Sequence, residues 1–172
     1  MGNTKEKPIH KKWWFWVITI IVIGAISSNF TGGDEQQITN SQTEEKLSEQ
    51  QQATIDSLND FSAFIENYKQ LEEEKTTTWD KYLYGETVTW TGTVMDVSTK
   101  QIYIWGKDYN NQTWDTLSQE DHEKYNVFIA KFENEVPSDI NTGDDITVKG
   151  ILESRGDYES NTNWKLYESK VQ

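Results

Sequence analysis

From residue 86 onward, apolar and polar residues alternate in short runs that turn-forming residues separate. The clearest run follows Glu86, where threonines alternate with apolar residues. Such alternation is typical of a half-buried β-strand. Five runs of this kind predict a small closed or nearly closed β-barrel, and Gly92 inside the first run indicates a bend or bulge. The predicted strands begin at residue 86 and cover residues 101–105, 125–132, 145–152 and 164–171.

A different periodicity precedes the strands. Between residues 47 and 74, apolar residues recur at spacings of three and four, which predicts one amphipathic helix of about 25 residues. This helix would pack on the following domain or form a short coiled coil, and binding to a partner is the alternative. A second short helix is expected from Trp79 to Tyr84, with Thr78 as N-cap and Gly85 at its end. The apolar stripe consists of Ile55, Leu58, Phe61, Ile65, Tyr68 and Leu71.

A continuous apolar run near the N-terminus follows a lysine-rich segment and extends from residue 13 to residue 26. As a helix, residues 13–30 would span about 27 Å, which is enough for a thin or locally thinned bilayer. We therefore predict a transmembrane anchor in which tryptophans lie at the interface and lysines reach the headgroups. The residues expected to do so are Lys11, Lys12, Trp13, Trp14 and Trp16.

The charges around this run predict its orientation. Four lysines precede it and few positive charges follow closely, which places the N-terminus in the cytoplasm and the C-terminal domain outside the cell membrane. A cleaved secretory signal has the same basic start and apolar centre, and Ala25 and Ser27 supply small residues near its end. In that alternative the protein is secreted. Both interpretations export residues 31–172.

The remaining segments complete the predicted organisation. Residues 31–46 are polar, rich in Gly, Ser, Thr and Gln, and lack periodicity, which predicts a flexible stalk. The expected fold class is mainly β with helices: an N-terminal transmembrane helix, an amphipathic helix, and a small five-stranded OB-like β-barrel. The predicted parts are a cytoplasmic basic segment (1–12), the anchor (13–30), the stalk (31–46), the amphipathic helix (47–75) and the barrel domain (76–172).

Charge narrows the range of partners. The chain carries a net charge of −13, and its first 30 residues hold four Lys and one Glu, which leaves −16 for residues 31–172. An acidic domain of this kind repels phosphate backbones, so nucleic acid is a disfavoured partner. The chain also contains eight Trp, eight Tyr and six Phe. These rings supply core area to a small domain that has no cysteine for disulfides.

Short motifs in the strand region resemble those of OB-fold domains. They include residues 84–94, 102–104 and 127–129, and the most specific is Ile140-Asn-Thr-Gly-Asp-Asp-Ile-Thr-Val-Lys-Gly150, followed by Trp164-Lys-Leu166. The pattern resembles the tRNA-anticodon-binding-like OB domains of exported bacterial proteins whose role is uncharacterised. The Lys-Lys-Trp-Trp-Phe-Trp start of the anchor is similar to single-span anchors of Gram-positive surface proteins. The resemblance covers residues 78–172 and the anchor, and implies a fold more than a function.

OB domains that bind oligonucleotides or sugars commonly use the face of strands 2 and 3 with the flanking loops. Aromatic side chains on such a face stack on bases or sugar rings. A nucleic-acid site also needs a basic groove, but acidic residues interrupt the lysines here, so a peptide or neutral glycan fits better. Packing of these rings in the core or loops is the alternative. If Ile102 and Ile104 point inward, Tyr103 and Trp105 point outward. The candidate ligand-binding residues are Tyr103, Trp105, Lys107, Tyr109, Trp114 and Phe128.

Catalytic and metal-binding motifs are weak. The loop from Asp108 has oxygen ligands at alternate positions, but Thr113 and Gln119 stand where a calcium loop requires Gly and Glu. His122 is the only histidine after the anchor, and neither a nucleophile elbow nor a phosphate-binding Gly loop is present. We therefore expect no enzyme, no metal site and no cofactor.

The leading hypothesis is a membrane-anchored, extracytoplasmic binding or interaction module. Its expected partners are the lipid bilayer, through residues 13–30, and an envelope protein, peptide or neutral glycan. One alternative is an exported single-strand nucleic-acid-binding domain that uses Tyr103, Trp105 and Phe128. Another is a structural or oligomerisation module that acts through the helix at residues 47–74.

Overall fold

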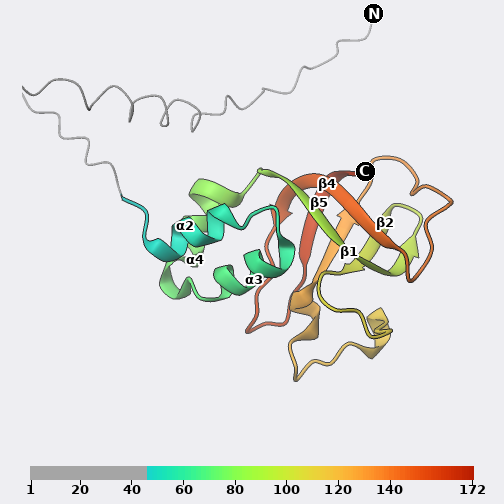
Figure 1. The fold of residues 1–172 in the computed structure, drawn as a ribbon, viewed down its shortest axis with the longest axis horizontal. Coiled ribbons are helices and arrows are strands. Elements are labelled where there is room, and N and C mark those ends of the chain that lie inside the picture. Colours follow the sequence, from blue (N-terminus) through green and yellow to red (C-terminus); the bar gives the residue numbers. More distant parts are fainter. Residues whose placement is uncertain (1–45) are drawn as a thin grey trace, which may run out of the picture. The chain divides into compact units, whose positions relative to one another are not determined.

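The alternating runs form five strands that close into a barrel in the computed structural model, which describes residues 46–172 (Figure 1). The strands follow the order β1–β2–β3–β5–β4, and β4 pairs with β1 to close the barrel. Neighbouring strands are antiparallel except β3 and β5, which are parallel. The predicted five-stranded OB-like barrel is confirmed. The strands are β1 (Thr87–Ser98), β2 (Gln101–Trp105), β3 (Val127–Lys131), β4 (Asp145–Ser154) and β5 (Trp164–Val171).

The long strand β1 belongs to both sides of the barrel. Its first half pairs with β4 and its second half with β2, and the register shifts between Val94 and Asp96. The bulge predicted at Gly92 therefore lies at Met95. Gly92 has a different role: a Cβ at this position would lie 2.3 Å from the carbonyl oxygen of Trp105. Only glycine lets β1 and β2 approach so closely.

Large aromatic rings fill the barrel. The side chains of Trp90, Phe128 and Trp164 are fully buried, and each comes from a different strand. The rings of Trp90 and Phe128 lie 5.4 Å apart in an edge-to-face arrangement, and those of Trp90 and Trp164 lie 6.4 Å apart. Interlocked rings of this kind give a small barrel a large apolar core.

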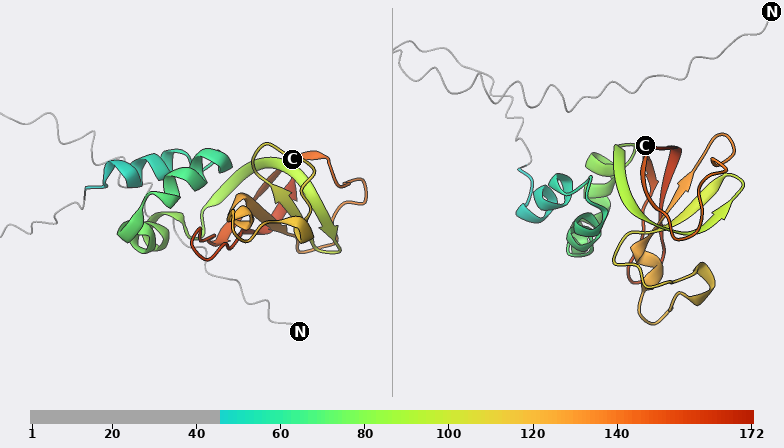
Figure 2. Two further views of the ribbon diagram at one scale, coloured as in Figure 1. Left: turned by 90° about the horizontal axis from the view of Figure 1, so that it is seen from below. Right: turned by 45° about the vertical axis from the view of Figure 1, so that its right-hand side comes forward.

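Short helices cover one end of the barrel (Figure 2). Since side chains of α3 touch rings of the barrel interior, this helix must lie over an open end. Phe61 contacts Trp90 and Phe128, and Phe64 contacts Trp90 and Trp164. The helical elements before the barrel are α2 (Glu49–Asp56), α3 (Phe61–Lys69), a 3-10 turn (Glu72–Glu74), α4 (Lys75–Thr78) and a π-helical turn (Trp79–Leu83). Two further 3-10 turns, Trp114–Thr116 and Glu123–Asn126, lie between β2 and β3.

The prediction of one continuous helix from residue 47 to residue 74 is wrong. The chain leaves the helix after Asp56 and begins α3 at Phe61, where the Asp60 side chain accepts a hydrogen bond from the backbone of Ala63. The intervening residues bond to β1: Leu58 O accepts from the Trp90 indole (2.8 Å), and the Asn59 side chain accepts from Thr89 N (2.9 Å). These tertiary bonds favour the break over a continued helix.

The short helix expected at Trp79–Tyr84 is also not separate. Helical backbone runs on from α4 into the π-helical turn, and Thr78 makes no cap. Instead, the buried Thr78 hydroxyl accepts a hydrogen bond from the Gln51 side chain of α2 (3.1 Å). Gly85 does follow the end of this element, with a φ of +81° that suits glycine.

Several predictions fall on residues 1–45, which lie outside the described residues. They are the basic segment, the transmembrane anchor at residues 13–30 and most of the stalk. Within residues 46–172, no helix has the length and apolar character needed to cross a membrane.

Candidate functional site

The structure decides which side of β2 faces the core. Ile102 and Ile104 point into the barrel core, whereas Tyr103 and Trp105 belong to a second apolar cluster on the opposite face. Trp105 is nevertheless only 4% exposed. The outer face of the sheet is therefore covered. The second cluster contains Met95, Trp105, Leu117 and Val127, with Tyr103, Tyr109 and Trp114 packed against it.

The segment between β2 and β3, residues 106–126, provides this cover. Its backbone is held against β2 at Asp108, whose carbonyl oxygen accepts a hydrogen bond from the Trp105 indole (3.0 Å). Further along, the Tyr109 hydroxyl donates to Gln112 O (3.1 Å), and the Trp114 ring lies 4.8 Å from that of Tyr103. Tyr103, Tyr109 and Trp114 stay partly exposed at the rim of the cluster. We call these three side chains the aromatic rim.

The other two candidate ligand-binding residues lie elsewhere. Phe128 is 0% exposed and packs inside the barrel, 4.9 Å from the ring of Phe61, so it is not part of a surface. Lys107 forms an ion pair with Glu66 of α3, which directs its ammonium group towards the helices. The structure thus brings together Tyr103, Trp105, Tyr109 and Trp114, but not Phe128 or Lys107.

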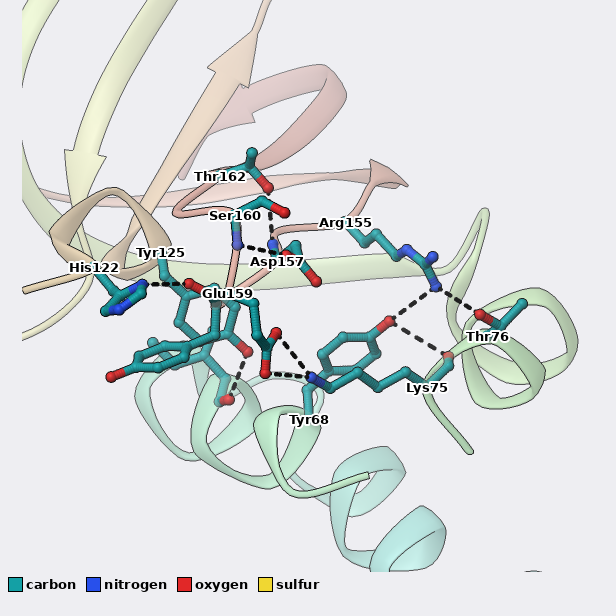
Figure 3. A network of polar contacts seen from close by, with 12 residues as sticks. Tyr68, Lys75, Thr76, His122, Tyr125, Arg155, Asp157, Glu159, Ser160 and Thr162 are labelled. Carbon is teal, nitrogen blue, oxygen red and sulfur yellow. Dashed lines mark hydrogen bonds and ion pairs between the residues drawn. The ribbon is translucent and has the colours of Figure 1, made fainter. Parts of the chain in front are cut away.

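A polar network joins the helices to the β4–β5 loop (Figure 3). The Tyr125 hydroxyl donates to Ile65 O of α3 (2.8 Å), and burial raises the pKa of Tyr125 well above its usual range. Burial also raises the pKa of Tyr68, although nearby Arg155 opposes this shift. Lys75 pairs with Glu159 at 3.3 Å. These contacts hold the β4–β5 loop against α3 and α4.

The histidine of the domain is engaged in this network. His122 adopts a left-handed backbone (φ 53°), and its Nδ1 lies 2.6 Å from Tyr158 O, so Nδ1 must carry the proton that the carbonyl accepts. The imidazole stacks on the Tyr158 ring with centroids 4.3 Å apart. The Lys69 ammonium lies 3.4 Å from the same ring centroid, and both groups cannot share one face. The ring is therefore held between them, which indicates a structural role for His122.

A surface hollow lies beside the β4–β5 loop and has a composition unusual for this chain. It has a volume of about 550 Å³, and its three charged lining residues, Lys124, Arg155 and Lys165, are all cationic. Trp114 of the aromatic rim and Asn161 also line it. We call this the basic hollow. Sequence analysis missed it because its cations come from three segments far apart in the chain; the available signal was that Arg155 is the only arginine.

Asp157 and Asn161 order the loop that borders the hollow. The Asp157 carboxylate accepts a hydrogen bond from Ser160 N (2.7 Å). Hydrogen bonding with the Ser160 side chain is the main cause of a lowered pKa for Asp157, and the backbone bond adds to it. Asn161 is 3% exposed and has a φ of 50°. Its amide oxygen accepts from Lys124 N (2.9 Å). Among residues 46–172, no group of three or more His, Asp or Glu side chains is placed to hold a metal ion.

Comparisons with known proteins add little to this geometry. No protein-family model and no curated protein matches the chain. Among solved structures, it is similar to a YobA protein from Bacillus subtilis, with 13% sequence identity and a TM-score of 0.32 over 51% of this chain and 97% of the YobA chain. We draw neither fold nor function from a likeness of this size.

Proposed function

We propose that this chain is a membrane-anchored, extracytoplasmic binding or interaction module whose ligand is an envelope protein, a peptide or a glycan. The membrane part of the proposal rests on the apolar run at residues 13–30 and its basic flank. The binding part rests on the barrel surface.

The observation that carries the binding function is the aromatic rim. Tyr103, Tyr109 and Trp114 are partly exposed above a buried apolar cluster, on the face that OB folds commonly use for ligands. Rings fixed from below lose little conformational freedom when they stack on a sugar ring or pack on a peptide. The rim borders the basic hollow through Trp114, so polar groups lie next to a stacking surface.

The alternative functions have less support. The apolar stripe predicted to drive oligomerisation is used within the chain, because Phe61, Ile65, Tyr68 and Leu71 are buried in the barrel core cluster. A nucleic-acid site that uses Tyr103, Trp105 and Phe128 would need all three rings on one surface, yet Trp105 and Phe128 are buried. We therefore favour a peptide or glycan ligand.

Protease treatment of intact cells tests the location. We expect the full-length protein to keep residues 1–30, to sediment with membranes and to lose its C-terminal domain to external protease. Resistance of the domain after removal of the wall and any outer barrier would contradict the orientation.

Co-sedimentation with protein-free cell-wall sacculi, and separately with the envelope protein fraction, tests binding. We expect Tyr109→Ala and Trp114→Ala to reduce binding to one of these fractions. Tyr84→Ala is the matched control, because Tyr84 is the large apolar residue of the described chain that is most exposed (58%) and lies outside the rim. Equal losses for all three variants, or none, would contradict a role for the rim.

A further inference from the structure

We propose that the basic hollow binds a saccharide that carries a carboxylate or a phosphate group. This inference rests on the proposed binding function and names its ligand class. It also changes one expectation from the sequence, because the glycan would be acidic instead of neutral.

The first argument is that the three cations of the hollow form no ion pairs with described carboxylates. This holds although the chain has 29 acidic residues and Asp157 lies near enough to Arg155 for Arg155 to help lower its pKa. Lys124 Nζ lies 5.2 Å from the Trp114 ring centroid, and Arg155 reaches only the hydroxyls of Tyr68 and Thr76, at 3.4 and 3.5 Å. Lys165 makes no ion pair with a described residue. Three unpaired cations around one hollow favour an anion.

Three acidic residues of the same loops have other partners. Glu123 accepts a hydrogen bond from the backbone of Ser118, and Asp157 accepts from that of Ser160. Glu159 pairs with Lys75 on the helical side of the loop. None of these three carboxylates lines the hollow. The charged residues that line the hollow are therefore all cationic, in a domain that is strongly negative.

The second argument is that the hollow is preorganised. Besides accepting from Lys124 N, the Asn161 side chain donates to Ser118 O (3.3 Å) and Gln119 O (3.4 Å). One buried amide thus fixes the loop that carries Lys124 to the loop that carries Arg155. A site whose walls are already held in place loses less free energy on binding.

The third argument is the combination of ring and cations. The partly exposed Trp114 lines the hollow beside Lys124, and aromatic rings are suited to stacking on sugar rings. Hydroxyl and amide groups of Ser160, Thr162 and Asn163 line the same space and match sugar hydroxyls. Oligonucleotides need a basic groove that follows several phosphates. Here the cations surround one hollow, which fits a single acidic sugar unit better.

The test is a titration of the ¹⁵N-labelled full-length protein in detergent micelles at low salt, followed through backbone amide shifts. The probes are D-glucuronic acid, D-glucose 6-phosphate, D-glucose, inorganic phosphate and an oligothymidylate. We expect both acidic sugars to shift the amides of Lys124 and Thr162 and to bind about tenfold more tightly than glucose. The two acids distinguish a carboxylate from a phosphate as the preferred group.

Lys165→Gln is the most informative variant, because Lys165 forms no ion pair with a described residue and its replacement breaks no such contact within the protein. We expect it to weaken the acidic sugars several-fold. Lys170→Gln is the matched control: it makes the same charge change on the same strand, at an exposed position that does not line the hollow. Trp114→Leu keeps an apolar side chain but removes the ring, so it should weaken sugar binding and leave phosphate unchanged.

Several results would overturn the proposal. They are equal binding of glucose and glucuronic acid, equal effects of Lys165→Gln and Lys170→Gln, and phosphate binding as tight as that of glucose 6-phosphate. Tighter, salt-sensitive binding of the oligothymidylate would replace the saccharide with nucleic acid. Failure of the proposed function can be told apart from failure of this site. If the protein binds the acidic sugars but does not co-sediment with envelope fractions, only the envelope role is refuted. If it co-sediments with sacculi and Lys165→Gln leaves this unchanged, only this site is refuted.

Discussion

Replacing Phe64 by alanine should destabilise the whole barrel, although Phe64 belongs to a helix that precedes it. The Phe64 side chain is fully buried, and its ring centroid lies 5.0 Å from that of Trp164 and 5.7 Å from that of Trp90. Phe→Ala substitutions in cores cost about 3–5 kcal/mol, and more when the cavity cannot collapse. Since the neighbouring rings are held by strands, we expect the free energy of unfolding to fall by about 4 kcal/mol.

Urea denaturation of residues 46–172, which belong to one compact unit, measures this change. With a slope of roughly 2 kcal/mol per molar urea, the midpoint should fall by about 2 M. Tryptophan fluorescence reports on the barrel and far-ultraviolet circular dichroism on the helices. Ser62→Ala is the control, because Ser62 is exposed on the same helix, and it should change stability by no more than about 0.5 kcal/mol.

Two results would refute this reasoning. A loss below about 1 kcal/mol would mean that Phe64 does not close the barrel, because it is far less than core truncations cost. Helical signal that disappears at lower urea than the tryptophan signal would mean that α3 is a detachable arm on a barrel that is stable alone.

Three further outcomes follow from single contacts. Because the pKa of Tyr125 is raised in the folded protein, tyrosine ionises first in the unfolded chain, and the free energy of unfolding should fall above about pH 10. In a series of denaturation curves at alkaline pH, Tyr125→Phe should reduce the dependence of this free energy on pH by up to ~1.4 kcal/mol per pH unit. An unchanged dependence on pH would contradict this prediction. The lowered pKa of Asp157, which accepts from Ser160, contributes stability that is lost as pH falls below about 4. The free energy of unfolding of Asp157→Asn should therefore depend less on pH in this acid range than that of the wild type. Parallel plots of this free energy against pH for the two proteins would be evidence against the prediction. Gly106→Ala would place a Cβ 1.9 Å from the Phe61 ring and should lower the free energy of unfolding by about 1–3 kcal/mol or more. Adding Phe61→Leu should restore part of this loss. Strictly additive effects of the two substitutions in a double-mutant cycle would disprove the clash.

Much of the fold could be predicted because strand signals are local. The alternation around Trp90 marked β1, and β2 and β5 begin and end where the pattern indicates. The helical region was harder, since its break depends on bonds that Leu58 and Asn59 make to β1. Nothing in the 3.6-residue periodicity shows that a carbonyl and an amide will find partners some thirty residues away.

The site illustrates the same limit. Alternation within β2 places Tyr103 and Trp105 on one face and Ile102 and Ile104 on the other, but does not show which face is the core or that residues 106–126 fold over the aromatic face. The basic hollow needs the pairing of β4 with β5, which places Lys165 opposite Ser154 and so next to Arg155, and the position of Lys124 just before β3. Long-range strand pairing sets these neighbours, and single-sequence patterns do not encode it locally.

The parallel pairing of β3 with β5 has a consequence for biogenesis. β5 extends to Val171, and the barrel stays open until this strand inserts between β3 and β4. Its partner β3 ends at Lys131, and helix α3, which covers the end of the barrel, lies about a hundred residues upstream of β5. The nascent chain therefore leaves Phe61, Phe64 and the interior tryptophans uncovered until β5 has emerged, because non-local contacts of this kind form late. We expect the domain to fold only after β5 has been synthesised and has emerged, and to depend until then on factors that shield its aromatic residues.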